Sequence, residues 1–172
     1  MFIASKKFDL AIVPVTDDIV KRLLDDNKKL YTIEPITTGN ASDTYDGADV
    51  FILGYPGLVG EEYQQRALMR SGIIAWTDSS NPAGSEFLVD SRIFPGNSGG
   101  PVFSSAAGMT RDASVASGKV IKLLGIVSKT VNAKPELALG VHLPDEAMVI
   151  GAAGVGVIEP AQELIALMVQ VP

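Results

Sequence analysis

One serine in this sequence has neighbours that suit nucleophilic chemistry. Ser98 lies within residues 95–101, PGNSGGP, where three glycines flank it. Glycine tolerates positive φ and lets a ligand approach the backbone closely. Consecutive amides at Gly96, Asn97 and Ser98 can converge on one point, and such a nest stabilises the oxyanion of an acyl-transfer intermediate. The four letters GNSG taken alone fit a plain glycine-rich β-turn equally well.

The composition narrows the classes of function. The chain has 172 residues, 47% hydrophobic and 20% charged, which is enough for the core of about one domain. Its formal net charge of −6 disfavours general binding to nucleic-acid phosphates. The lack of cysteine and the single histidine exclude disulfides, thiolate nucleophiles and multi-histidine metal sites. No apolar run is long enough to span a membrane, and residues 1–7 lack the apolar core of a signal peptide. As written, the sequence fits a cytoplasmic location.

Short runs rich in β-branched residues predict a mostly β fold. Turn-forming Gly, Pro and Ser separate these runs, which favours a sandwich or a barrel. The strands are expected at residues 9–15, 49–54, 67–76, 86–90, 100–104, 120–128 and 137–143.

Two helices complete the expected elements. Thr16 can cap a first helix that runs through Leu24. Pro160 opens a second helix, whose apolar face should dock on the barrel. That face consists of Leu164, Ile165, Leu167 and Met168. Residues 151–156 are expected to form a glycine-rich connecting loop.

The segment GNSGGP at 96–101 resembles the nucleophile signature of chymotrypsin-like serine proteases, in the form common among bacterial trypsin-like and HtrA-type enzymes. Four further stretches match that family in the same order. They resemble the strand of the triad aspartate at 9–12, the first strand of the second barrel at 47–56, the strand after the nucleophile at 124–128, and the far wall of the specificity pocket at 140–144.

The resemblance implies a chymotrypsin-like double β-barrel, of which this chain holds only a part. Residues 1–36 would be a remnant of the first barrel, with the strand of the triad aspartate and a linking helix. Residues 37–172 would be the second barrel with a C-terminal helix. No metal or organic cofactor is implied. The expected partner is a peptide or protein substrate, with no nucleic acid and no membrane.

The resemblance also implies roles for single residues. Ser98 would be the nucleophile, the amides of Gly96 and Ser98, with Asn97 between them, would form the oxyanion hole, and Asp9 would orient the general base. A substrate strand would pair with an edge lined by Ser128, Lys129 and Thr130.

Arg92 is a candidate for substrate specificity. It lies six residues before Ser98, where the family has the base of its specificity pocket. A cation there would favour an acidic substrate side chain, with assistance from His142. The alternative is an arginine that faces solvent or pairs with Asp90 and leaves a pocket for a small or apolar residue.

The sequence departs from the family at the general base. The family's histidine precedes the aspartate, and residues 1–8 contain none. His142 follows Ser98, and we expect it in a pocket wall rather than as the base. The chain alone should therefore be inactive or nearly so. The chain would be a fragment of a complete protease or, alternatively, would itself be a pseudoprotease that binds a peptide strand in the substrate groove.

The apolar residues of the strand at 9–15 favour a longer parent. In the chain alone, Leu10 and Ile12 on one face and Val13 and Val15 on the other would lack a barrel to cover them. Such an exposed apolar edge strand promotes self-association.

Overall fold

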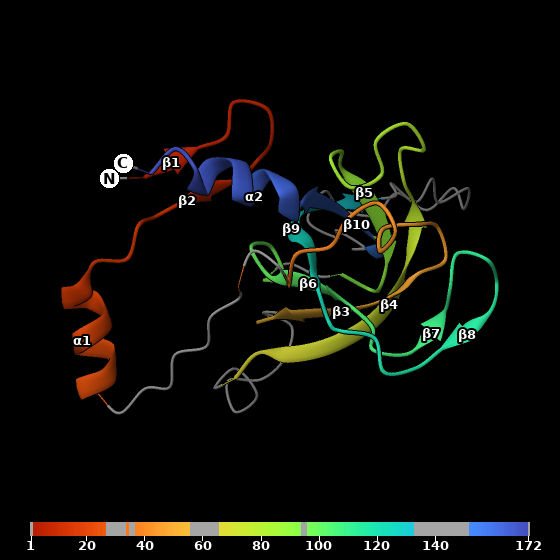
Figure 1. Cartoon of the computed structure of the whole chain (residues 1–172), viewed down its shortest axis with the longest axis horizontal. Helices are drawn as coiled ribbons and strands as arrows, with labels where there is room; N and C mark the ends of the chain where they lie inside the picture. Colours follow the sequence, from red (N-terminus) through yellow and green to blue (C-terminus); the bar gives the residue numbers. More distant parts are fainter. Residues whose placement is uncertain are drawn as a thin grey trace, which may run out of the picture.

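A closed barrel of six antiparallel strands forms the body of the molecule (Figure 1). The computed structural model describes residues 2–26, 34, 37–55, 66–93, 96–132 and 152–171. Around the barrel the strands follow the order β10-β5-β4-β3-β6-β9. Their bounds are Asp49–Gly54 for β3, Leu68–Trp76 for β4, Phe87–Asp90 for β5, Pro101–Ser104 for β6, Leu123–Asn132 for β9 and Ala152–Pro160 for β10. The predicted mostly β fold with a closed barrel is confirmed.

Alternating side chains fill the barrel. Along β3, Val50 and Ile52 point inward and are at most 1% exposed, while Asp49 is exposed. This period of two is what a strand with one buried face requires. The other strands supply the rest of the core, which includes Ile74, Phe87, Val89, Val102, Leu124, Val127 and Ile158.

Strand β10 corrects the expectation of a connecting loop at residues 151–156. It lies between β5 and β9 and hydrogen-bonds to both. The glycines in this segment are explained by backbone angle and by close packing instead of by a loop. Gly154 adopts φ 76°, and a Cβ on Gly156 would lie 2.1 Å from Ile93 Cδ1. Glycine in a strand often marks such a close approach or an irregular register.

A small hairpin and a helix lie together at one end of the barrel (Figure 1). The hairpin pairs β1 (Ile3–Ala4) with β2 (Ala11–Ile12), so the strand expected at 9–15 is shorter than predicted. Helix α2 (Ala161–Met168) contacts β2 and β9, with Pro160 as its N-cap residue. Leu167 is 1% exposed, but Met168 is 52% exposed, so the predicted apolar face is only partly correct.

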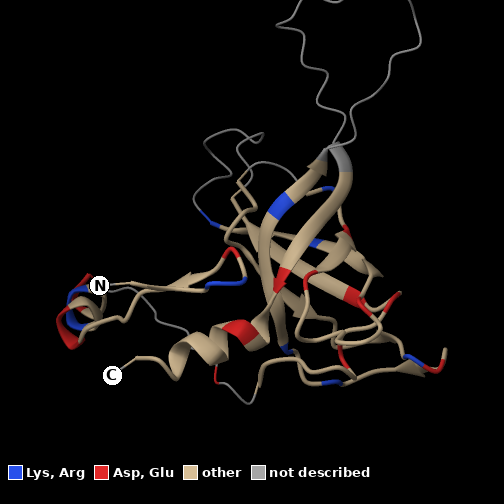
Figure 2. Cartoon of the chain, turned by 90° about the horizontal axis from the view of Figure 1, so that it is seen from above, with Lys and Arg blue, Asp and Glu red and all other residues tan. Residues whose placement is uncertain are grey.

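The remaining elements lie outside the barrel. Helix α1 (Asp17–Asp25) stands apart from the barrel in both cartoon views (Figure 1 and Figure 2). It has no buried residue. Thr16 is its N-cap residue, but its side chain makes no capping hydrogen bond. A two-stranded sheet of β7 (Gly108–Met109) and β8 (Val115–Ala116) lies between β6 and β9 in the sequence, where no strand was predicted. No helix in the described part of the chain has the length and apolarity needed to cross a membrane.

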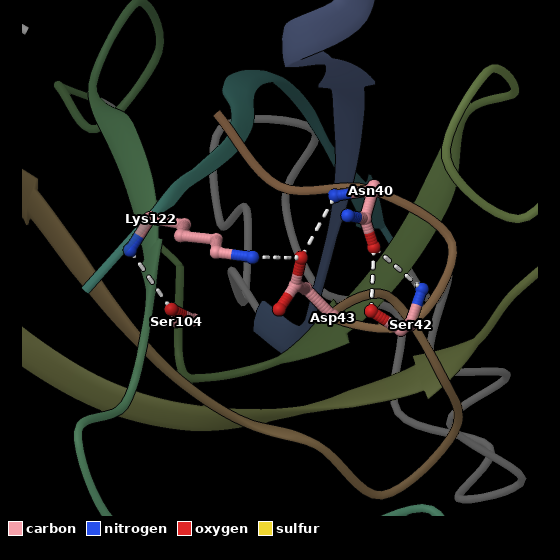
Figure 3. A network of polar contacts seen from close by, with 5 residues as sticks. All are labelled: Asn40, Ser42, Asp43, Ser104 and Lys122. Carbon is pink, nitrogen blue, oxygen red and sulfur yellow. Dashed lines mark hydrogen bonds and ion pairs between the residues drawn. The ribbon is translucent and has the colours of Figure 1, made fainter. Parts of the chain in front are cut away.

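A polar network holds the start of β9 against the loop before β3 (Figure 3). Lys122 Nζ and Asp43 Oδ2 form an ion pair at 2.9 Å, and the same oxygen accepts from the amide of Asn40 at 2.9 Å. The Lys122 amide donates to Ser104 Oγ at the end of β6, also at 2.9 Å. Strand β9, which supports the candidate site, is thereby fixed at its first residues.

Candidate active site

The turn that carries Ser98 is hydrogen-bonded to the strands on both sides. Tyr55 N, just after β3, donates to Gly96 O at 3.1 Å. Val127 of β9 accepts from Gly99 N at 2.8 Å through its carbonyl and donates to Gly100 O at 2.9 Å through its amide. The turn itself closes with Gly100 N donating to Asn97 O at 2.9 Å. These bonds hold the backbone on either side of Ser98 in a single conformation.

The glycines around Ser98 are required by space and by backbone angle. Gly96 and Gly99 adopt φ values of 97° and 80°, which L-residues with a Cβ rarely reach. Gly100 has an ordinary φ, but a Cβ there would lie 2.1 Å from Leu53 O. Gly54 is also closely packed, because a Cβ there would lie 2.6 Å from Asn97 Oδ1.

The backbone amides predicted to stabilise the oxyanion are not used in hydrogen bonds to backbone carbonyls of the described residues. Within the described residues, the amides of Gly96, Asn97 and Ser98 donate to no backbone carbonyl. The Asn97 side chain is 1% exposed, and its Nδ2 has no hydrogen-bond partner there. Ser98 itself is exposed at the tip of the turn. Gly96 and Ser98 are thus accessible from solvent, whereas Asn97 between them is buried.

Asp9 and the Ser98 turn meet on consecutive residues of β9. Asp9 lies between β1 and β2, and its Oδ2 accepts a hydrogen bond from Ser128 Oγ at 3.1 Å. The preceding residue, Val127, holds Gly99 and Gly100. Two residues that are 89 positions apart in the sequence, Asp9 and Ser98, are thus brought to the same stretch of one strand.

Residues 128–130 of β9 lie beyond its pairing with β6. Residues 123–126 pair with β6, whereas Lys129 and Thr130 pair with β10. In the described part of the chain, no strand pairs with the opposite edge of residues 128–130. An extended peptide could add there through backbone hydrogen bonds, as strand-addition recognition requires.

One acidic residue near this site was not identified from the sequence. Glu159, at the end of β10, is 1% exposed. Burial is the main cause that raises the pKa of its carboxyl, and the charge of Glu86 raises it further. Hydrogen bonds from the Ser128 hydroxyl and the Asp9 amide oppose that rise. The available signal was a single acid in an otherwise apolar run, at 155–160.

The candidate specificity residues are only partly described. Arg92 is exposed, adopts φ 27°, and its carbonyl accepts from Arg70 Nη1 at 3.0 Å. It lines a shallow cavity of about 510 Å³ formed by β4 and β5, and Ser98 does not line that cavity. No ion pair joins Arg92 to Asp90 in the described part of the chain. His142 lies outside the described residues.

A protein family and a solved structure match this chain. A family model described as the trypsin-like peptidase domain matches residues 2–109, which include Asp9 and Ser98. A solved chain, Rv3671c from M. tuberculosis H37Rv, in the inactive form of a serine-to-alanine mutant, matches at 16% identity with a TM-score of 0.43. The match covers 78% of the present chain and 52% of that chain, so the present chain spans about half of it. No curated protein matches the sequence.

Proposed function

The chain belongs to the trypsin-like peptidase domain family, and on that premise we propose that it is the nucleophile-bearing part of a serine endopeptidase. The observation that carries the proposal is the shared support of Ser98 and Asp9 by β9. Val127 holds the turn of Ser98 through two backbone hydrogen bonds, and Ser128 binds Asp9 at 3.1 Å.

In this proposal Ser98 Oγ attacks the carbonyl carbon of a peptide bond. The general base takes the hydroxyl proton as the O–C bond forms, and the amides of Gly96 and Ser98 stabilise the oxyanion. The base then gives the proton to the leaving amine as the C–N bond breaks, and water hydrolyses the acyl-enzyme. Asp9 orients the base and stabilises its charged form. Residues 128–130 of β9 hold the substrate strand.

The base is the one member of this machinery that the sequence does not supply before Asp9. Ser98 Oγ makes no hydrogen bond within the described residues. A serine hydroxyl without a base is a poor nucleophile at neutral pH. We therefore expect this chain alone to acylate slowly and to respond to a base added from solution.

Phosphonate labelling tests the proposal. The chain is incubated with an aryl phosphonate at increasing imidazole concentrations, and the mass of the adduct and its position are measured. We expect imidazole to accelerate labelling at Ser98. Ser98→Ala should abolish it, and Asp9→Asn should reduce the acceleration. Ser79→Ala, a change at another exposed serine, is the matched control and should have no effect. Labelling at other residues, or at Ser98 without dependence on Asp9, would overturn the proposal.

A second candidate is a pseudoprotease that binds a peptide strand. Within the described residues, β6 does not extend along residues 128–130 of β9 and the Ser98 hydroxyl makes no hydrogen bond, and both observations favour it. Peptide affinity together with phosphonate labelling distinguishes the two functions. A binding module keeps its affinity in Ser98→Ala and shows no phosphonate adduct with imidazole, whereas a protease part shows the adduct.

A further inference from the structure

The turn that carries Asp9 is closed around the hydroxyl of one serine. This turn joins β1 to β2 and runs from Ser5 to Leu10, and Ser5 N donates to Leu10 O at 2.8 Å across its ends. Within the turn, the amides of Lys7 and Phe8 both donate to Ser5 Oγ at 3.1 Å. Leu10 N donates to Phe8 O at 2.8 Å, so the residues on both sides of Asp9 are hydrogen-bonded.

The same hydroxyl donates its own proton to the C-terminal helix. Ser5 Oγ donates to Oε1 of Glu163 on α2 at 2.6 Å, although the two residues are 158 positions apart in the sequence. A serine hydroxyl has one proton and two lone pairs. The two turn amides and the Glu163 carboxyl therefore use its whole hydrogen-bonding capacity, and the two amides leave the proton directed at Glu163.

Helix α2 is attached to the barrel on the side that meets this turn. The helix follows β10 directly, and it contacts both β9 and β2. Ala161 and Leu167, near its two ends, are each 1% exposed, and Glu163 lies between them in the first turn. The β1–β2 hairpin lies beside α2, as Figure 2 shows from a second direction. The bond from Ser5 to Glu163 thus ties the turn to an element that the barrel itself holds in place.

Asp9 therefore lies between two attachments to the rest of the molecule. One is the partly buried bond between Ser5 and Glu163. The other is its own exposed bond, in which Asp9 Oδ2 accepts from Ser128 Oγ at 3.1 Å. A hydrogen bond is electrostatically stronger away from water than in it. We therefore expect the bond between Ser5 and Glu163 to contribute more to the position of the turn.

We propose that Ser5 and Glu163 are positioning residues for Asp9. Their hydrogen bond holds the Asp9 side chain against Ser128, on the strand that also supports the turn of Ser98. The role of Asp9 as the partner of a general base rests on the proposed function. The attachment of its turn to α2 does not, since it is a property of the folded chain. Glu163 is needed only as an acceptor, so an uncharged oxygen at the same place can replace its carboxyl.

Amide hydrogen exchange measured by NMR tests the attachment without any need for activity. The amides of Phe8 and Leu10 flank Asp9 and report on its turn. Glu163→Ala removes the acceptor, and we expect both amides to exchange roughly 2- to 12-fold faster, which corresponds to the net loss of one hydrogen bond. Glu163→Gln keeps a side-chain oxygen that can accept the same bond and should restore the protection. Gln162→Ala, at the neighbouring exposed position of α2, is the matched control and should leave both amides unchanged.

Imidazole-dependent labelling at Ser98 tests the consequence for Asp9. Glu163→Ala should reduce the acceleration that imidazole gives, and Glu163→Gln should retain it. In the Asp9→Asn background, Glu163→Ala should cause no further loss, because its effect passes through Asp9. A role in general stability alone would lower the acceleration by the same factor in both backgrounds.

Three results would contradict this role: unchanged exchange on either side of Asp9 in Glu163→Ala, an equal rise in Gln162→Ala, or an equal loss of acceleration in the Asp9→Asn background. If Glu163→Ala does not fold, Ser5→Ala breaks the same bond from its other end and takes its place. A lack of imidazole dependence in the unmodified chain would refute the proposed function, and the exchange rates would still decide the attachment. Normal labelling with unchanged exchange would keep the protease proposal and refute only the positioning role.

Discussion

At Gly100 the surrounding backbone leaves no space for a Cβ atom. A Cβ there would lie 2.1 Å from Leu53 O and 2.8 Å from Asn97 O, and both are backbone atoms. Ordinary contact begins at 3.4 Å. No rotamer change can relieve the clash, so Gly100→Ala must move the turn away from β3 by roughly an ångström, by simple hard-sphere geometry.

That movement strains the hydrogen bonds that hold the turn. Gly100 N donates to Asn97 O, and Gly100 O accepts from Val127 N, both at 2.9 Å. Loss of one such bond costs about 0.5–1.5 kcal/mol net, and overpacking adds typically about 1–3 kcal/mol. We expect Gly100→Ala to lower the free energy of unfolding by roughly 2–4 kcal/mol. For a chain of this length, that corresponds to a Tm lower by roughly 4–16 °C.

Thermal denaturation followed by circular dichroism measures the effect. Gly118→Ala is the matched control, because a Cβ there meets nothing within 4 Å and only the φ of 73° penalises it. That left-handed conformation costs about 1–2 kcal/mol. The reasoning fails if Gly100→Ala unfolds at the same temperature as the unmodified chain, or is no less stable than Gly118→Ala.

Two further predictions concern other parts of the molecule. In urea unfolding, Leu167→Ala should lower the free energy of unfolding by about 2–5 kcal/mol, because Leu167 is 1% exposed. Met168→Ala, at a residue that is 52% exposed, should change it by no more than about 0.5 kcal/mol. Similar values for both variants would refute the docking of α2. Burial raises the pKa of Glu159, so its contribution to stability is full below the ordinary carboxyl pKa and is lost as pH rises through the raised value. The stability of Glu159→Gln relative to the unmodified chain should therefore increase with pH, and a flat or falling difference would contradict the assignment.

The parts of the fold that follow a local rule could be predicted from the sequence. Strand β3 begins and ends where the apolar run between Asp49 and Gly54 indicates, because a half-buried strand repeats every two residues. The two helices also lie where their spacing predicts them. The turn around Ser98 could be identified because its glycines are required by the backbone itself.

Strand β10 could not be predicted in this way. Its glycines locally favour a loop, and only neighbours from other segments, such as Ile93 against Gly156, explain them. The assignment of residues 151–156 to a loop was wrong because tertiary packing outweighed local preference. The roles predicted for Asp9, Ser98 and the edge at 128–130 stay predictions, now with a geometry that can be tested.

Glu159 shows most clearly what a sequence pattern leaves out. Read along the chain, it precedes Pro160 and looks like the acidic start of a helix. In the barrel, the same residue lies at the end of a strand and is only 1% exposed, and burial raises the pKa of its carboxyl. The cost of burying a carboxyl depends on its neighbours in space, and none of those neighbours is adjacent in sequence. The raised pKa of this carboxyl therefore follows from the closed barrel and not from the local sequence.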